Sequence, residues 1–153
     1  MANTYTQLHV QMIFAVANRR GLISESNREE VERYMCGILR NMKSKVHAIY
    51  CNPDHCHILI GLHPENSISD LVRNVKAQTS KWINDRKLTE GRFNWQEGYA
   101  AFTYQSSDIK PIRKYICSQP EHHQTKTFKQ EYIEFLTAQG IDFDERYIFL
   151  TLD

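Results

Sequence analysis

The stretch DHCHILIGL, residues 54–62, alternates between two kinds of side chain in a way that predicts a β-strand. Successive side chains of an extended chain point to opposite faces of a sheet, so every second residue shares a face. His55, His57 and Leu59 share one face. The other face is apolar throughout and carries Cys56, Ile58, Ile60 and Leu62. The apolar face predicts packing against helices, whereas the two imidazoles on the opposite face have either a structural or a chemical role that this stretch alone does not decide.

The segments around this stretch predict its partners in a sheet. QLHVQMIFAVA, residues 7–17, alternates in the same way and predicts a first strand. KVHAIYC, residues 45–51, predicts a second strand, and Asn52–Asp54 has the residues of a tight turn into the histidine strand. YAAFTY, residues 99–104, predicts a fourth strand. Four strands are therefore expected, with the histidines on the third.

Helical patterns fill the intervals between these strands. Ser26–Glu29 has the spacing of a capping box, and apolar residues follow at helical spacing up to Met42. Ser67 predicts the N-cap of a second helix, with Asp70 three residues later. Ser107 predicts the N-cap of a third helix with Pro111 near its first turn, where proline is tolerated. The stretch TFKQEYIEFLTAQG predicts a fourth helix that stops at Gly140.

The order β-α-β-β-α-β followed by C-terminal helices predicts an α+β chain with a ferredoxin-like (RRM-like) antiparallel sheet. Residues 1–153 are expected to form a single domain, since the chain has no internal repeat, low-complexity tract or linker. Two helices on one face leave the histidine face to be covered. We expect the C-terminal helices or a second subunit to cover it.

Composition narrows the class of protein. Hydrophobic residues make up 41% and charged residues 24% of the chain, which is ordinary for a globular protein. The sequence contains no apolar run near the ~20 residues that span a bilayer and no signal-peptide pattern at its start. We therefore expect a cytoplasmic protein that does not insert into membranes. The four cysteines form no CxxC pair and are expected to be free thiols.

Charge is unevenly distributed, although the net charge is only +1. Residues 73–87 contain five basic side chains and one acid, and residues 110–129 again contain five basic side chains and one acid. Such runs are usually solvated faces. Two of them in one small domain are also compatible with a partner that carries a phosphate backbone.

His55 and His57 would place both rings on one face, with Cα atoms roughly 6–7 Å apart. Both rings could then reach one metal ion. Two histidines hydrogen-bonded to their neighbours are the structural alternative. A zinc site that adds Cys51 is a further alternative, but no paired cysteine or histidine completes four ligands.

The stretch IRKYICSQPEHH, residues 112–123, predicts a helix with chemistry on one side. Tyr115 and Gln119 are four residues apart and share a face of a helix. Ile112 and Ile116 form a neighbouring stripe that can be buried, so Tyr115 need not belong to the core. A tyrosine that only packs at the edge of the helix is the alternative.

An HxH strand followed by a helix with Tyr-x-x-x-Gln resembles the single-tyrosine transposases of the HUH endonuclease superfamily, including insertion-sequence and REP-associated enzymes. The resemblance covers almost the whole chain. It is carried by HVQMIFAVANRR, PDHCHILIGL, VRNVKAQTSKWIN, FNWQEGYAAFTYQSS and IRKYICSQPEHHQTKTFKQEYIEFL. Cys56 departs from the bulky hydrophobic residue of the family pattern, but cysteine also behaves as a small apolar residue.

The resemblance implies a metal-dependent transposase that cuts and rejoins single-stranded DNA at hairpin-marked element ends. His55, His57 and Gln119 match the family's metal ligands, with Mg²⁺ or Mn²⁺ as the expected ion. Tyr115 matches the nucleophile that forms a 5′-phosphotyrosine and leaves a free 3′-OH. The covalent link keeps the energy of the broken bond, so a 3′-OH can later rejoin strands without ATP.

DNA contacts and assembly are further expectations. We expect phosphate contacts from basic residues near the first strand, on the second helix and beside Tyr115: Arg19, Arg20, Arg73, Lys76, Arg113 and Lys114. Candidates for stacking on bases are Phe93, Trp95, Tyr99 and Tyr104. The family resemblance implies a homodimer whose active sites are completed in trans by the helix that carries Tyr115.

Two alternative functions stay open at this point. A non-catalytic, RRM-like nucleic-acid-binding module would need neither Tyr115 nor the histidines and would place aromatic residues on the sheet surface. A domesticated relative that processes host repeat hairpins would keep the same chemistry as a mobile transposase.

Overall fold

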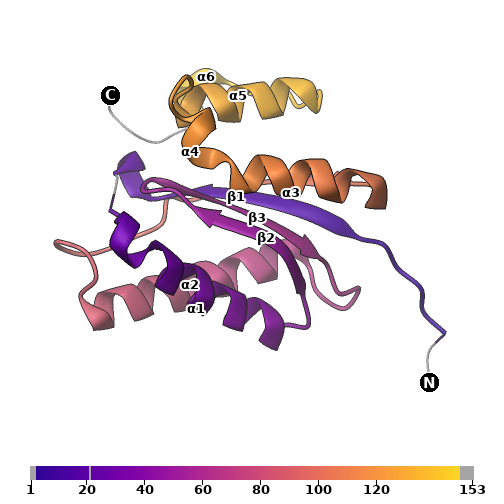
Figure 1. Cartoon of the computed structure of the whole chain (residues 1–153), viewed down its shortest axis with the longest axis horizontal. Coiled ribbons are helices and arrows are strands. Elements are labelled where there is room, and N and C mark those ends of the chain that lie inside the picture. Colours follow the sequence, from indigo (N-terminus) through magenta and orange to yellow (C-terminus); the bar gives the residue numbers. More distant parts are fainter. Residues whose placement is uncertain (1–2, 21, 149–153) are drawn as a thin grey trace.

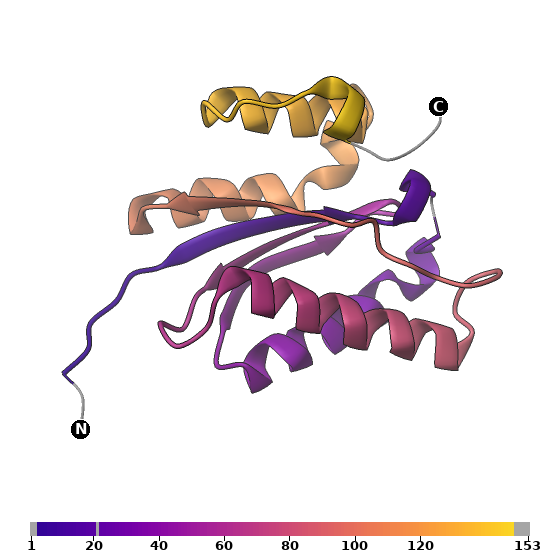
Figure 2. The same ribbon diagram turned by 180° about the vertical axis from the view of Figure 1, so that it is seen from behind.

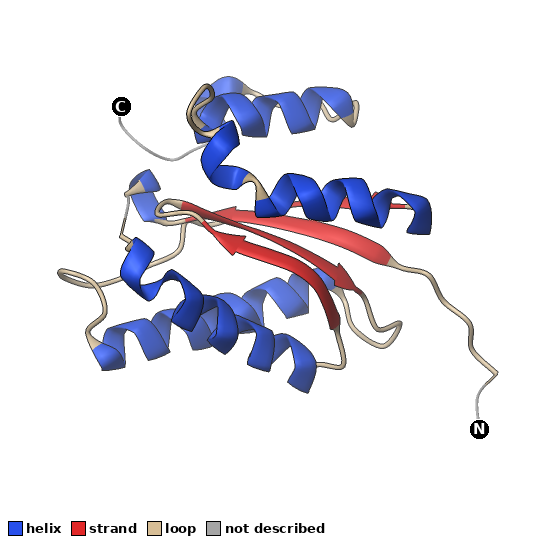
Figure 3. Cartoon of the chain, viewed as in Figure 1, coloured by secondary structure: helices blue, strands red, loops and turns tan. Residues whose placement is uncertain are grey.

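The computed structural model describes residues 3–20 and 22–148. The described chain forms three layers (Figure 1). Two long helices lie on one side of an antiparallel sheet, and the C-terminal helices lie on the other, as the colouring by secondary structure makes clear (Figure 3). The chain therefore has the α+β architecture expected from its sequence.

The sheet has four strands in the order β2-β3-β1-β4. Their bounds are β1 His9–Ala15, β2 Lys45–Cys51, β3 His55–Gly61 and β4 Ala100–Tyr104. All neighbouring strands are antiparallel. The histidine strand β3 and the first strand β1 are central, and their register pairs His55 with Ala15 and His57 with Ile13. This order and connectivity confirm the ferredoxin-like prediction.

Helices α1 (Glu25–Asn41) and α2 (Ile68–Arg86) cover the apolar face of the sheet. Ser67 caps α2 as predicted, because its side chain accepts a hydrogen bond from the backbone N–H of Asp70 at 3.1 Å. The start predicted for α1 is two residues late. Ser24 takes the N-cap position with an extended backbone, and Glu25 already begins the helix.

The second helical layer covers the histidine face (Figure 2). Of the two covers expected from the sequence, the C-terminal helices or a second subunit, the structure shows the C-terminal helices of the same chain. Its main elements are α3 Ile109–Cys117, α4 Gln119–His122 and α5 Phe128–Ala138. Shorter helical segments are η1 Ala17–Arg19, η2 Ser106–Asp108 and α6 Glu145–Ile148.

Two details of this layer differ from the sequence prediction. Ser107 does not cap the third helix, because Gln105 and Asp108 form a capping box around η2 and α3 begins only at Ile109. Tyr115 and Gln119 do not share one continuous helix, because α3 ends at Cys117 and Gln119 begins α4. Pro120 explains the break, since proline has no N–H to donate to the preceding turn.

The structure bears on the expectations about the cysteines and about membrane-spanning segments. The four cysteines are free, as predicted. No helix within residues 3–20 and 22–148 is long and apolar enough to cross a membrane.

Gly140 follows α5 with a φ of +66°, a conformation that glycine adopts without strain at the end of a helix.

Candidate active site

His55 and His57 lie side by side on the face of β3 that is turned toward the C-terminal helices. Both side chains are buried, and their ring centroids are 5.1 Å apart. An oxygen atom lies against Nδ1 of each ring. Gln11 Oε1, on β1, is 2.9 Å from His57 Nδ1, and Asp54 Oδ1, in the hairpin turn, is 2.6 Å from His55 Nδ1.

These partners determine which ring nitrogen carries the proton. A carboxylate can only accept, so His55 Nδ1–H donates to Asp54. Gln11 donates its amide N–H to Tyr104 Oη at 2.9 Å, which leaves its carbonyl oxygen to accept from His57 Nδ1–H. In the neutral form of either ring, Nε2 then carries the lone pair. Imidazoles held at Nδ1 in this way present Nε2 to a metal ion.

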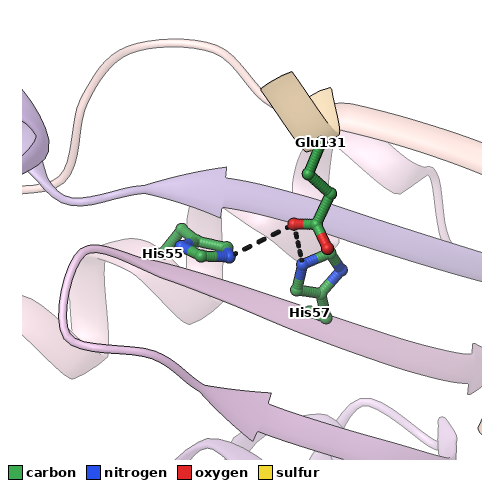
Figure 4. Close-up of side chains that lie close together, drawn as sticks. All are labelled: His55, His57 and Glu131. Carbon is green, nitrogen blue, oxygen red and sulfur yellow. Dashed lines mark hydrogen bonds and ion pairs between the residues drawn. The ribbon is translucent and has the colours of Figure 1, made fainter. Parts of the chain in front are cut away.

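Glu131, on α5, places its carboxylate where the two imidazoles converge (Figure 4). Its Oε1 is 2.9 Å from His57 Nε2 and 3.4 Å from His55 Nε2. His123 Nε2 lies 3.4 Å from the same oxygen. The side chain of Glu131 is only 3% exposed, so this carboxylate is enclosed by the cluster.

The donor set fits a divalent metal ion. Donor atoms of His55, His57 and Glu131 all lie within 4.8 Å of one another. Two imidazole nitrogens and a carboxylate oxygen suit first-row divalent ions, and the carboxylate also suits Mg²⁺ and Mn²⁺. Cys51 does not join them, because it packs in the core on the α1/α2 side. A zinc site that includes Cys51 is therefore not formed.

Burial and charge set the protonation of the cluster. Burial lowers the pKa of His57 to about 4, although the nearby carboxylate of Glu131 acts in the opposite direction. Burial alone would raise the pKa of Glu131, but the surrounding imidazoles of His123, His55 and His57 outweigh it and lower that pKa. The site thus holds an ionised carboxylate beside a neutral His57, which are the protonation states that metal ligation requires.

Tyr115, on α3, reaches the same carboxylate. Its hydroxyl donates a hydrogen bond to Glu131 Oε2. Its ring stacks on that of His122, with centroids 4.2 Å apart and planes inclined by 26°. Burial and the hydrogen bond to Glu131 raise the pKa of Tyr115, so the phenol keeps its proton near neutral pH. Tyr115 thus lies beside the histidines of its own chain.

Gln119 is also in the site, but its carbonyl oxygen has other partners. Oε1 accepts from Asn52 Nδ2 at 3.1 Å and lies 3.0 Å from His123 Nε2. Its amide nitrogen donates to Glu131 Oε2 at 3.3 Å. In this arrangement the oxygen closest to the two histidines belongs to Glu131 and not to Gln119.

The basic residues expected to contact DNA lie in different environments. Arg20, Arg113 and Lys114 are exposed. Arg73 pairs with Asp70 at 2.7 Å, and Lys76 donates to two backbone carbonyl groups. The side chain of Arg19 lies outside the described part of the chain. None of the other five residues, whose side chains the structure describes, belongs to the histidine cluster, and all contacts with DNA stay predictions.

Only one of the four aromatic candidates for base stacking has substantial exposure. Phe93 is fully buried, Trp95 packs edge-on against its ring, and Tyr104 accepts the hydrogen bond from Gln11. Tyr99, by contrast, is 40% exposed.

Sequence reasoning missed Glu131 and Gln11. Glu131 lies among the apolar residues of α5, between buried Phe128 and buried Leu136. A lone acid on the inner stripe of an amphipathic helix was the available signal. Gln11 gives a similar signal, because it is a polar residue on β1, a strand in which every residue is buried.

Several solved structures have a similar fold, and two of them are described here. A candidate transposase from Deinococcus radiodurans R1 superposes with a TM-score of 0.63 and 20% identity, covering 78% of this chain and 95% of that chain. A REP-associated tyrosine transposase bound to a REP hairpin superposes with a TM-score of 0.62 and 16% identity, covering 100% of this chain and 93% of that chain. At these identities the likeness shows the fold.

Sequence comparison is more specific. No curated protein sequence matches the chain. The family model described as "Transposase IS200 like" matches residues 4–119, which include all four strands, both histidines, Tyr115 and Gln119. This match spans more than half of the sequence, and the protein therefore belongs to the IS200-like transposase family.

Proposed function

We propose that this transposase cuts and rejoins single-stranded DNA through a covalent bond to Tyr115, with a divalent metal ion held by His55 and His57. The observation that carries the proposal is the convergence of both Nε2 atoms and the Tyr115 hydroxyl on one buried carboxylate, Glu131. A passive nucleic-acid-binding module has no need for a nucleophile enclosed in this way.

His55, His57 and Glu131 would hold the ion, and Mg²⁺ or Mn²⁺ is the expected species. When bound, such an ion polarises a phosphate oxygen and offsets the charge that develops during displacement. Gln11 and Asp54 keep both imidazoles in the tautomer that offers Nε2. Gln119, the family's third ligand by resemblance, would position Glu131 through its amide nitrogen or offer its oxygen after rotation of the amide.

Tyr115 would attack the phosphorus of the scissile phosphodiester. The bond from phosphorus to the 3′-oxygen breaks, the 5′-phosphate is joined to tyrosine, and a strand with a 3′-OH leaves. The phenol must lose its proton, and Glu131 Oε2 already accepts a hydrogen bond from it. The reverse attack by a 3′-OH rejoins strands without an external energy source.

The substrate would be single-stranded DNA next to a hairpin. The structurally similar REP-associated tyrosine transposase is bound to a REP hairpin, which supports a hairpin as the partner here. The homodimer with sites completed in trans stays a prediction about the assembly. Within one chain, Tyr115 already lies beside its own Glu131, so the geometry supports a site that works in cis.

Tyr115→Phe tests the proposal most directly. The substitution removes only the hydroxyl, so DNA binding is retained while the covalent protein–DNA adduct disappears completely. The assay incubates the protein with Mn²⁺ and labelled single-stranded hairpin oligonucleotides from the gene's flanks and separates adducts on a denaturing gel. Tyr34→Phe, on α1, is the matched control and keeps the adduct. An adduct that persists without the Tyr115 hydroxyl excludes this residue as the nucleophile.

A further inference from the structure

The ring of Tyr115 has three aromatic neighbours, and one of them lies nearly parallel to it. The ring of His122 stacks on it, with centroids 4.2 Å apart and planes inclined by 26°. His57 and Phe135 approach it at steep angles of 74° and 84°, with centroids 6.1 and 5.6 Å away. Among the residues that the structure describes, His122 therefore makes the closest ring contact with Tyr115.

The break between α3 and α4 makes this stack possible. On one continuous helix, residues seven positions apart lie about 10.5 Å apart along the axis, which is too far for their rings to stack. The chain instead leaves α3 at Ser118, whose hydroxyl donates to Lys114 O at 2.6 Å. Figure 1 shows α4 turning away from the line of α3 toward α5. This turn brings His122, at the end of α4, back to Tyr115.

Backbone hydrogen bonds hold His122 in this position. Its N–H donates to Ser118 O at 3.2 Å, and its carbonyl oxygen accepts from the N–H groups of Thr125 and Lys126 at 3.2 and 3.1 Å. The imidazole is not held in this way, because its buried Nε2 has no hydrogen-bond partner among the described residues. A buried polar atom without a partner costs free energy. Hydrogen bonding at Nε2 therefore does not explain the place of the ring, whereas the stack on Tyr115 does.

The stack complements the hydrogen bond between Tyr115 and Glu131. That bond fixes the hydroxyl and the stack fixes the plane of the ring, so the two contacts together define the orientation of the side chain. Attack on a phosphate requires such an orientation, because a displacement of about 1 Å can slow a reaction roughly a hundredfold. The hydrogen bond also depends on the phenolic proton, which attack removes, whereas the stack does not depend on it.

We propose that His122 is a positioning residue for the nucleophile, whose imidazole keeps the phenol of Tyr115 directed at the metal-binding cluster during attack. The inference rests on the proposed cleavage by Tyr115. It assigns the function to the flat ring of His122 and not to its nitrogen atoms, so another flat ring at this position should serve as well. A break that only placed Gln119 in the cluster would need no aromatic residue at position 122.

The first test measures the stack without DNA, by NMR of protein labelled with ¹³C in the tyrosine rings. The chain has 8 tyrosines, and Tyr115→Phe identifies the resonance of Tyr115 by its loss. We expect an upfield shift from ring stacking, which His122→Ala removes and His122→Phe retains. Tyr34, on α1 and identified in the same way, is the internal control and stays in place. A Tyr115 resonance that is unaffected by His122→Ala overturns the inference.

The second test measures how fast adducts form in a single turnover, with Mn²⁺ and increasing concentrations of the hairpin oligonucleotides. We expect His122→Ala to lower the maximal rate about tenfold and to leave the half-saturating DNA concentration unchanged. His122→Phe should restore the rate, and His63→Ala, outside the cluster, is the control. A residue that only stabilised the fold would show neither this split nor this rescue. A loss confined to DNA affinity, or no rescue by phenylalanine, contradicts the inference.

These outcomes separate the inference from the proposed function. Absence of any adduct with the unmodified chain defeats the proposed function, and the role of His122 in attack is defeated with it. Adducts that form as fast in His122→Ala as in the unmodified chain defeat the inference alone. If His122→Ala does not fold, His122→Leu takes its place, because leucine fills the position without a flat ring. The same loss of about tenfold is then expected, and a rate equal to that of His122→Phe would contradict the inference.

Discussion

Adjacent residues of β3 point to opposite faces of the sheet, and the two faces have different chemistry. Toward α1 and α2, Cys56, Ile58 and Ile60 are fully buried in the apolar core. Toward α3–α5, His55 and His57 are buried just as completely, but against Glu131. Burial therefore has two different effects in this molecule. One face gains free energy from removing apolar surface from water, and the other removes polar groups from water so that they interact strongly with one another.

The largest expected effect is that of Ile58→Ala, on the apolar face of β3. Loss of a fully buried isoleucine should lower the free energy of unfolding by about 3 kcal/mol, measured by urea denaturation in EDTA. Ile49→Ala, at the half-buried cross-strand neighbour, should cost roughly half as much. Folded Ile58→Ala should bind Mn²⁺ like the unmodified chain. A large loss of metal affinity would show that the two faces are not independent.

On the polar face, the prediction concerns how the free energy of unfolding depends on pH in the absence of metal. The pKa of His57 is lowered to about 4 in the folded chain, compared with 6.5 for the free side chain. Between these values the unfolded chain binds a proton that the folded chain does not, so stability falls as pH falls from 6.5 to 4. The loss should reach up to roughly 3 kcal/mol. His123, whose pKa is raised by its hydrogen bond with Glu131, opposes part of this loss.

The measurement is the urea midpoint between pH 7 and pH 4.5, above the range in which the lowered pKa of Glu131 begins to matter. His57→Gln should flatten the pH dependence, whereas His63→Gln, outside the cluster, should leave it unchanged. An unaltered slope in His57→Gln would contradict the assignment of this titration to His57.

The third and smallest effect distinguishes Glu131 from Gln119 as the oxygen donor. Glu131→Gln should weaken Mn²⁺ binding at least about tenfold, or ~1.4 kcal/mol, because a charged ligand is replaced by a neutral one. Gln119→Ala should weaken it less, since the carbonyl oxygen of Gln119 faces Asn52 and His123. Isothermal titration with Mn²⁺ measures both, and Glu134→Gln, on the exposed side of α5, is the control. Tighter binding in Glu131→Gln would mean that the carboxylate competes with the ion.

Local sequence patterns predicted most of the strands and helices of the fold. The alternation of residues 54–62 correctly assigned each side chain of β3 to its face, because a strand has a period of two. The hydroxyl of Ser67 and the backbone N–H of Asp70 formed the predicted cap, because such a cap depends only on neighbours in sequence. The two central strands and the two helices of the apolar layer were predictable for the same reason.

The composition of the candidate site was less predictable. His55 and His57 were identified from their spacing, and Tyr115 and Gln119 from the resemblance to a family, but Glu131 was not identified at all. It reaches His57 from 74 positions along the chain, and only the docking of α5 brings the two together. The break before Gln119 is predictable from Pro120, because helices usually end at or before the residue that precedes a proline.

The position of α3 and α5 in the chain has a consequence for protein synthesis. All four strands, both long helices and both histidines are encoded before residue 105, whereas Tyr115 and Glu131 follow. Translation proceeds from the N-terminus, so a nascent chain acquires its sheet before it acquires Tyr115, the proposed nucleophile. A chain interrupted by premature termination anywhere between β4 and α3 therefore lacks any means of attaching itself to DNA through Tyr115.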